Sequence, residues 1–446
     1  MTFKYQIVAD LIKQKLFSGE YKPGKKLPSI KTLTKELSFN ADTIIRAYKL
    51  LETQHLIYAV SKSGYYAVKS VEKVNKENEI IDMLTTCPPD DINPYKDFYH
   101  CMEKAIALYE KKLFSYSSPK GMPELIHVLV KHMATFQVFT KPDNIFITNG
   151  SQQALYILGA MSFPNAGSKV LVEQPTYSVM LQILKCTKTP VIGIKRTHDG
   201  IDMDELESIF KQGDIKFFYT MPRYQNPTGF SYSNTQKTEI IQLASKYGVY
   251  IVEDDYLSDL ELDTKADPMY AMREQDLIIY IRSFSKALLP GLRLGMAILP
   301  EKLHNEFILY KRSMDLNTPI LTQGALEIYL QSSMYQYHVN KTKKHYKKKM
   351  AVLRESCEQQ LADIASFFVP STGIFAYIET NGVSSDRLVN MLSKHGLLVS
   401  STNNCYIDAF MHLEGLRLCT CKIESENIKK AVKLIKQQLE CFSKKS

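Results

Sequence analysis

The chain has 446 residues, of which 45% are hydrophobic and 23% charged, as is ordinary for a folded protein of two or three domains. Its eight cysteines include no C-x-x-C pair, and we expect no bound metal. No apolar stretch approaches the ~18 residues that cross a bilayer, and no signal peptide is evident. We therefore expect a soluble protein of the reducing cytoplasm with no membrane partner.

The net charge of +9 is concentrated near the N-terminus. Residues 1–70 contain 12 Lys and Arg against five Asp and Glu, whereas the other 376 residues carry a net charge of only +2. A small basic module joined to a nearly neutral larger one is expected when one part of a protein binds a polyanion.

Three helices are predicted within the first 55 residues. Apolar residues at helical spacing predict the first helix over residues 5–17. Ser29 is placed to cap a second helix that reaches about Leu37, and Asn40 is placed to cap a third helix of about 41–54. Because only three residues separate the second helix from the third, the pair indicates a helix-turn-helix.

A hairpin is predicted after these helices. Two β-rich runs at 56–60 and 65–68 flank a polar turn that contains Gly64, as in the wing of a winged helix. The whole stretch resembles the DNA-binding domain of GntR-type transcription regulators. The matching residues are P-G-x-x-L-P-S at 23–29, Thr43, Arg46 and Tyr48 on the third helix, and S-G-Y-Y at 63–66.

This resemblance implies that the domain binds double-stranded operator DNA. The residues expected at the DNA are Ser29, Lys31, Asn40, Thr43, Arg46 and Lys62. The family's Ser-Arg pair at the start of the third helix is Asn40-Ala41 here, and its Glu-Gly before the wing is Gln54-His55. The loss of that arginine predicts a DNA target that differs from those of relatives. A helix-turn-helix retained only to pack a dimer is the alternative.

A linker is predicted at residues 71–86, which are charged and polar without a strong apolar stripe. It would separate a domain of residues 1–70 from one of residues 87–446. In the second domain short apolar strands alternate with amphipathic helices, which predicts a mostly parallel sheet in a three-layer α/β/α fold. The strands include 145–148, 169–173, 217–220, 250–253 and 277–283. We expect a smaller C-terminal α/β subdomain to begin after about residue 315.

The segment S-F-S-K-A-L-L-P-G-L-R-L-G at residues 283–295 carries more chemistry than any other. A lysine that forms a Schiff base needs a site that favours its neutral amine, and the mostly apolar loop around Lys286 is such a site. Ser283, Ser285 and Arg293 are groups that bind a phosphate dianion. Together they predict a pocket for pyridoxal 5′-phosphate (PLP). The alternative is a buried loop with an incidental lysine.

A further phosphate contact is predicted at Gly150, Ser151 and Gln152, which follow the strand at 145–148 and open a helix. Backbone N–H groups at a helix N-terminus bind anions, and a glycine lets the ligand approach closely. Ligands of such sheets bind outside the carboxyl ends of the parallel strands, so we expect this turn to lie beside the Lys286 segment.

The Lys286 segment resembles the S-x-S-K-x-x-x-P-G-x-R-x-G anchor of the fold-type I aminotransferases. The resemblance implies that Tyr177 stacks on the pyridine ring of the cofactor. It also implies that Asn226 and Tyr256 contact the phenolic oxygen of the ring. A carboxylate keeps the ring nitrogen protonated in this family, and the resemblance favours Asp254 for that role over the neighbouring Asp255.

Two more residues are assigned by the same resemblance. Arg417 is expected to clamp the α-carboxylate of an amino-acid ligand as a bidentate fork, which lysine cannot form. Tyr116 is expected to reach across a dimer interface toward the cofactor.

The order of winged helix, linker and aminotransferase-like domain covers essentially the whole chain and resembles the MocR group of GntR regulators. The resemblance implies a homodimer that senses an amine or amino acid. Lys286 would hold PLP as an internal aldimine, and the effector would displace Lys286 by forming an external aldimine. Val179 stands where the GABA-responsive type has an extra arginine, so we expect a monocarboxylate held by Arg417.

Two other functions stay open on the sequence alone. One is a metabolic aminotransferase that transfers amino groups to 2-oxo acids and merely carries a winged helix. The other is a regulator whose effector is PLP itself. Whether the protein activates or represses, and which genes it controls, does not follow from these residues.

Overall fold

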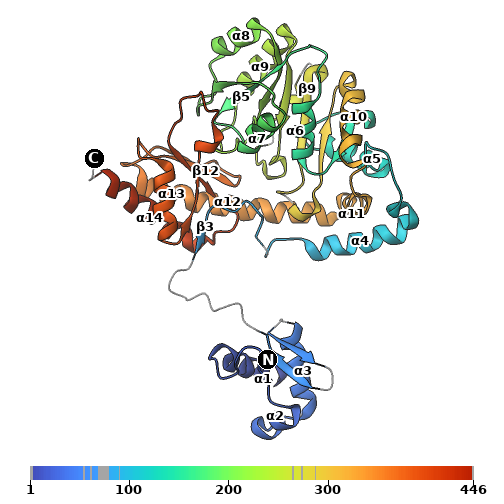
Figure 1. The fold of residues 1–446 in the computed structure, drawn as a ribbon, viewed down its shortest axis with the longest axis vertical. Coiled ribbons are helices and arrows are strands. Elements are labelled where there is room, and N and C mark those ends of the chain that lie inside the picture. Colours follow the sequence, from blue (N-terminus) through green and yellow to red (C-terminus); the bar gives the residue numbers. More distant parts are fainter. Residues whose placement is uncertain are drawn as a thin grey trace. The chain divides into compact units, whose positions relative to one another are not determined.

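The computed structural model describes residues 4–53, 56–60, 63–68, 80–89, 91–263, 266–272, 275–286 and 288–443. The chain forms two compact units, Met1–Glu79 and Ile80–Ser446 (Figure 1). Within the described ranges, no helix is long and apolar enough to span a membrane.

The smaller unit has the helices and the hairpin that the sequence predicts. Its elements are α1 (Lys4–Phe17), α2 (Ile30–Leu37), α3 (Ala41–Thr53), β1 (Ile57–Val60) and β2 (Gly64–Ala67). The Ser29 hydroxyl accepts a hydrogen bond from the backbone N–H of Thr32, and the Asn40 side-chain oxygen accepts one from the backbone N–H of Thr43. Both predicted N-caps are therefore confirmed. The apolar faces of the three helices form one small core under the hairpin.

The larger unit is organised around a seven-stranded sheet in the order β4-β10-β9-β8-β7-β5-β6 (Figure 1). Strand β10 runs antiparallel to both of its neighbours, and every other strand is parallel, so the expected mostly parallel sheet is confirmed. The strands are β4 (Ile145–Thr148), β5 (Lys169–Gln174), β6 (Val191–Lys195), β7 (Ile215–Thr220), β8 (Tyr250–Asp254), β9 (Ile278–Ser283) and β10 (Gly295–Ile298).

Helices cover both faces of this sheet and bury two separate cores. Successive residues of a strand point to opposite faces, so Phe218 enters one core while Phe217 and Tyr219 enter the other. The first core includes side chains of α4 (Tyr95–Tyr109), α5 (Pro123–Ala134), α8 (Met203–Gln212), α9 (Asn234–Tyr247) and α11 (Ile320–Gln331). The second includes side chains of α6 (Ser151–Ala160), α7 (Ser178–Cys186) and α10 (His304–Asp315).

A smaller C-terminal subdomain contains most of a third core. It has the sheet β11-β12-β15-β14 and the helices α13 (Ser385–Lys394) and α14 (Ser425–Ser443). The strands are β11 (Phe367–Phe368), β12 (Phe375–Glu379), β14 (Ser400–Ser401) and β15 (Gly415–Cys419). The long helix α12 (Ser333–Leu361) contributes to the first core near its start and to the third core near its end, so the subdomain begins within α12.

The predicted linker is too long at its C-terminal end. Strand β3 (Ile81–Asp82) pairs in parallel with β13 (Leu397–Leu398), and the side chains of Ile81 and Met83 are buried in the third core. The sequence placed residues 71–86 in a linker, whereas residues 80–86 belong to the larger unit. The prediction failed because Ile81 and Asp82 form a strand only by pairing with Leu397–Leu398, which is distant in the sequence.

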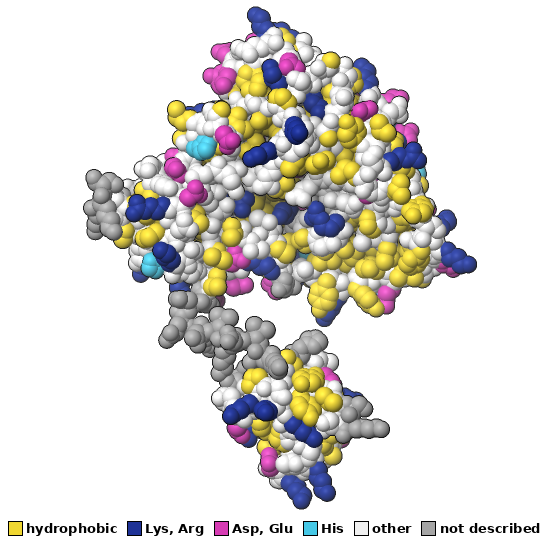
Figure 2. Space-filling view, in the orientation of Figure 1, with side chains coloured by type: hydrophobic (Ala, Val, Ile, Leu, Met, Phe, Trp, Pro, Cys, Tyr) yellow, Lys and Arg dark blue, Asp and Glu magenta, His cyan; other side chains and the backbone are white. Residues whose placement is uncertain are grey.

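An exposed apolar surface lies on α4 and on the segment that follows it. Figure 2 shows hydrophobic side chains gathered over the region of α4. The exposed large apolar residues there are Tyr95, Tyr99, Ile106, Leu108, Phe114 and Tyr116. Exposed apolar patches of this kind mark interaction surfaces in soluble proteins.

Candidate functional site

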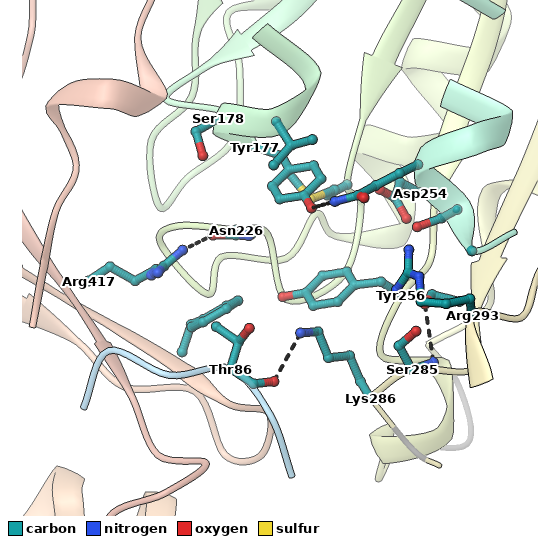
Figure 3. Close-up of a pocket in the computed structure, with 17 residues that line it drawn as sticks. Thr86, Tyr177, Ser178, Asn226, Asp254, Tyr256, Ser285, Lys286, Arg293 and Arg417 are labelled. Carbon is teal, nitrogen blue, oxygen red and sulfur yellow. Dashed lines mark hydrogen bonds between the residues drawn. The ribbon is translucent and has the colours of Figure 1, made fainter. Parts of the chain in front are cut away.

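A cavity of about 280 Å³ lies where the larger unit's main sheet meets the C-terminal subdomain (Figure 3). Twelve predicted cofactor or effector residues line it, although they come from segments spread over more than 260 positions. They are Gly150, Ser151, Gln152, Tyr177, Asn226, Asp254, Tyr256, Ser283, Ser285, Lys286, Arg293 and Arg417. The fold therefore brings together the residues that the motifs singled out.

Lys286 projects into the cavity from the loop that follows β9. Its Nζ donates a hydrogen bond to the backbone carbonyl of Thr86 at 3.0 Å (Figure 3). Burial lowers the pKa of the Lys286 amine below its ordinary value, and the positive charge of Arg417 acts in the same direction. Both effects favour the neutral amine that attacks a carbonyl carbon.

An anion site lies at one end of the cavity, where Arg293 lies against the backbone of Gly150. A Cβ added to Gly150 would lie 2.7 Å from Nη2 of Arg293, and Gly150 has a positive φ of 75°, immediately before the N-terminus of α6. The hydroxyl of Ser283 accepts a hydrogen bond from the backbone N–H of Ser285 at 3.2 Å. A guanidinium, two hydroxyls and a helix N-terminus form a set of groups that fits a phosphate dianion.

Asp254 occupies the cavity wall at the end of β8. Its Oδ2 accepts a hydrogen bond from the hydroxyl of Tyr219 at 2.9 Å, whereas its Oδ1 is buried without a hydrogen-bond partner among the described residues. Burial, together with the nearby charge of Asp255, raises the pKa of this carboxyl to about 7, although the hydrogen bond from Tyr219 acts in the opposite direction. A buried acceptor without a partner fits the N–H of a protonated pyridine ring.

The rival carboxylate, Asp255, is engaged elsewhere. It pairs with the buried guanidinium of Arg223, and it accepts a hydrogen bond from the hydroxyl of Tyr280 at 2.6 Å. Asp255 does not line the cavity. The geometry therefore favours Asp254 for contact with the ring nitrogen.

The other end of the cavity is formed by Arg417 on β15. Its Nη1 donates a hydrogen bond to the side-chain oxygen of Asn226 at 3.2 Å, and its guanidinium carbon lies 4.8 Å from the ring centre of Phe375 (Figure 3). The Nε of Arg417 is buried without a hydrogen-bond partner in the described part of the chain. Arg417 thus retains free donors for the carboxylate of a ligand.

The two tyrosines of the cavity make different hydrogen bonds. The hydroxyl of Tyr177 accepts a hydrogen bond from the Gln152 side-chain amide at 3.2 Å, so its ring is fixed above the cavity. The hydroxyl of Tyr256 donates to the backbone carbonyl of Tyr224 at 2.6 Å. Tyr256 lines the cavity, and its expected contact with the phenolic oxygen of the cofactor stays a prediction.

Tyr116 does not line the cavity, and its side chain is 88% exposed. A tyrosine that serves a neighbouring subunit is expected to be exposed in a single chain, so its role stays a prediction.

Five residues that line the cavity were not singled out for this role by the sequence. They are Thr86, Ser178, Met221, Phe375 and Val179, the last of which was named only for the arginine it replaces. Thr86 acts through its backbone carbonyl, so its side-chain identity gives no signal. Phe375 is identifiable only from the structure, through the contact of its ring with the Arg417 guanidinium.

The predicted DNA contacts lie on two helices of the smaller unit. Lys31 of α2 and Arg46 of α3 are exposed. The Nε of Arg46 lies 3.1 Å from the Oδ2 of Asp42. The side chains of Ser29 and Asn40 cap α2 and α3, and the hydroxyl of Thr43 donates a hydrogen bond to the Asn40 side-chain oxygen. Lys62 lies outside the described residues.

Fold and site together define a PLP-dependent unit of the fold-type I aminotransferase kind, joined to a winged helix. Residues 91–435 match the aminotransferase class I and II family, and residues 4–66 match the bacterial regulatory proteins of the gntR family. The cofactor of the larger unit is PLP.

Relatives share both units. The chain is 41% identical to the HTH-type transcriptional regulator YcxD of Bacillus subtilis over 98% of this chain and 100% of that protein. It is 28% identical to the HTH-type transcriptional regulator YdcR of Escherichia coli over 76% of this chain and 78% of that protein. The chain belongs to the aminotransferase class I and II family, within the MocR group of GntR-type helix-turn-helix regulators.

Solved structures agree on the fold. The kynurenine aminotransferase of Pyrococcus horikoshii superposes with a TM-score of 0.76 at 24% identity, covering 92% of this chain and 96% of that chain. LysN, an α-aminoadipate aminotransferase of Thermus thermophilus complexed with N-(5′-phosphopyridoxyl)-L-leucine, gives 0.75 at 22% identity, covering 82% and 94%.

We predict that Gly150→Ala weakens PLP binding by about ten- to a hundredfold, because the new methyl group displaces the Arg293 guanidinium from the anion site. Titration of cofactor-free protein with PLP, followed by absorbance, measures the effect. Gly248→Ala is the matched control, because Gly248 also has a positive φ, of 65°, but no atom lies within 4 Å of its added Cβ. Equal PLP affinities in the two variants would contradict this account of the anion site.

We predict that Asp254→Asn stabilises the cofactor-free protein at high pH but not at low pH. In the unfolded chain the carboxyl ionises near its ordinary pKa of 3.8, whereas in the folded protein burial raises its pKa to about 7. Wild-type stability therefore falls relative to the variant as the pH rises from about 4 to 7, by on the order of 2–4 kcal/mol, and the difference is constant above pH 7.

Urea unfolding of both cofactor-free proteins at pH 4.5, 6 and 8 measures this difference. A difference in the free energy of unfolding that does not change with pH would show that Asp254 is ionised throughout.

Proposed function

We propose that this protein is a transcription regulator whose winged helix binds operator DNA and whose larger unit senses an amine or amino acid through PLP. The observation that carries the proposal is the single cavity that gathers the anion site, Asp254, Lys286 and Arg417. Its chain also carries a basic winged helix. The bacterial chromosome lies in the cytoplasm, and we place the protein there.

The residues of the cavity have distinct parts in this proposal. Arg293, the two serines and the N-terminus of α6 bind the phosphate of the cofactor, and Asp254 keeps its ring nitrogen protonated. When bound, PLP supplies an electrophilic carbon that an amine can attack. Lys286 provides a neutral amine at that carbon, and Arg417 orients a ligand by its carboxylate.

The class of effector follows from the groups at the Arg417 end. Val179 lines the cavity where a second arginine would be needed for a ligand with a distant carboxylate. Arg417 is then the main cation for one carboxylate, and the ring of Phe375 lies beside it. These groups support an α-amino acid whose single carboxylate is held by Arg417 over GABA, whose carboxylate lies farther from its amine.

A homodimer is part of the proposal. The exposed apolar surface of α4 and the segment after it would be covered by a second copy. Tyr116 belongs to that surface, which supports its expected reach toward the cavity of the partner subunit.

A metabolic aminotransferase is the second candidate, because a specific observation favours it. Every group that the site needs for cofactor binding and carboxylate recognition is present around the cavity. The two functions are separated by steady-state turnover with amino donors and 2-oxo acids, measured beside DNA binding to the upstream region of the gene. High turnover without DNA binding would favour the enzyme.

We predict that Lys286→Ala abolishes the near-visible absorbance of the bound cofactor, its trapping by borohydride, and any effect of amino acids on DNA binding. The physical reason is that alanine has no nitrogen to bond to the cofactor. Lys349→Ala is the control, because Lys349 is a buried lysine outside the cavity whose Nζ donates to the carbonyls of Thr420 and Cys421. A variant that kept the absorbance band and a full response to amino acids would refute the role of Lys286.

We predict that Lys31→Ala and Arg46→Ala each weaken DNA binding for all sequences and reduce the slope of log K against log salt by about one, because each removes one phosphate contact. DNA titration at several salt concentrations measures the slope. Lys15→Ala is the control, because Lys15 lies on α1, outside the helix-turn-helix of α2 and α3, and pairs with Glu20 at 2.8 Å. An unchanged slope for either variant would remove that residue from the interface with DNA.

A further inference from the structure

The chain that leads from the winged helix enters the larger unit at residues 80–86, here called the strap. Backbone hydrogen bonds fix the strap to the larger unit and fold it locally. The backbone N–H groups of Ile81 and Met83 donate to the carbonyls of Gly396 and Leu398 at 2.8 and 2.9 Å. Asp82 folds the chain tightly, because its Oδ1 accepts from the backbone N–H groups of Leu84 and Thr85, each at 2.9 Å.

The strap also bonds to Lys286 and to the strand that carries Arg417. Thr86 lines the cavity, and its carbonyl accepts the hydrogen bond from Lys286 Nζ (Figure 3). The carbonyl of Met83 accepts a hydrogen bond at 2.8 Å from the backbone N–H of Cys419, two residues beyond Arg417 on β15. The strap is therefore bonded to the lysine directly and to the arginine through its strand.

We propose that the strap reports the bonding state of Lys286 to the winged helix, and this proposal rests on the proposed function. A lysine with a free amine donates to Thr86, as the structure shows. A lysine nitrogen that is bonded to the cofactor keeps at most one hydrogen, whose direction is fixed by that bond, and it no longer serves the carbonyl of Thr86. The strap then loses its hydrogen bond from Lys286 but keeps its pairing with β13 and its bond from Cys419.

The covalent path makes the strap a suitable reporter. In a single chain, residues 69–79 are the only covalent connection between the winged helix and the larger unit, and they join the strap at Ile80. Effector binding frees the amine of Lys286, and its bond to Thr86 forms again. A change in the bonding of Lys286 thus changes the number of hydrogen bonds that fix the strap, and with it the chain that leads to the winged helix.

Hydrogen exchange of the full-length protein tests this proposal with two cofactor forms. PLP has an aldehyde and bonds to Lys286, whereas pyridoxamine 5′-phosphate has no aldehyde and leaves the lysine amine free. We expect peptides that cover residues 80–86 to exchange about two- to tenfold faster in the PLP form, because one hydrogen bond of the strap is lost. In Lys286→Ala the two forms should exchange at the same rate.

Equal exchange of the wild-type strap in the two forms would overturn the proposal, as would the same difference in Lys286→Ala. A second variant tests the strap itself. Asp82→Ala removes the two bonds that fold the strap, so the difference between the forms should shrink while the absorbance of bound PLP is kept. Asp363→Ala, which removes an exposed carboxylate of the same subdomain, should keep the full difference.

DNA binding measured on the same samples separates this proposal from the proposed function. A DNA response to the two cofactor forms without a response of the strap would overturn the strap proposal alone. A response of the strap without any change in DNA affinity would overturn the claim that the cavity regulates DNA binding.

Discussion

The larger unit depends on keeping the amine of one lysine largely away from water. Lys286 can bond to an aldehyde only while its nitrogen is neutral, and burial in the cavity lowers its pKa for that purpose. That burial needs walls from both the main sheet and the C-terminal subdomain, because Asp254 comes from one and Arg417 from the other. The long helix α12, which contributes to the cores of both, holds those walls in register.

Several polar groups of this cavity are buried without full hydrogen bonding. Asp254 Oδ1 and Arg417 Nε have no partner among the described residues. Unpaired buried groups of this kind each cost about 1–3 kcal/mol, so a ligand that satisfies them also stabilises the fold around them. The same groups that select the cofactor and the carboxylate therefore link ligand binding to the stability of the subdomain contact.

The sequence predicted the main sheet closely because its strands are buried on both faces. Runs such as Phe217–Thr220 and Tyr250–Glu253 are rich in aromatic and β-branched residues, and the structure extends them by at most two residues. Of the twelve cavity residues, those around Gly150 and Lys286 were predicted from the chemistry of their segments, and the others from the resemblance to the fold-type I aminotransferases. The Thr86 contact was not predictable, because a backbone carbonyl leaves no mark in the sequence. The linker boundary failed for a related reason, since Ile81 and Met83 give an alternation only three residues long.

A sensor and an enzyme with this cavity differ in where the binding free energy goes. In an enzyme the difference between ligand states lowers a barrier within the cavity, whereas a regulator must transmit it to a second unit. A coupling of ~1–3 kcal/mol is typical of such transmission, which is the size of one or two hydrogen bonds. The strap places one ligand-dependent bond, from Lys286 to Thr86, on the segment that is continuous with the winged helix. The free energy of that bond reaches the lower end of this coupling range without any rearrangement of the main sheet.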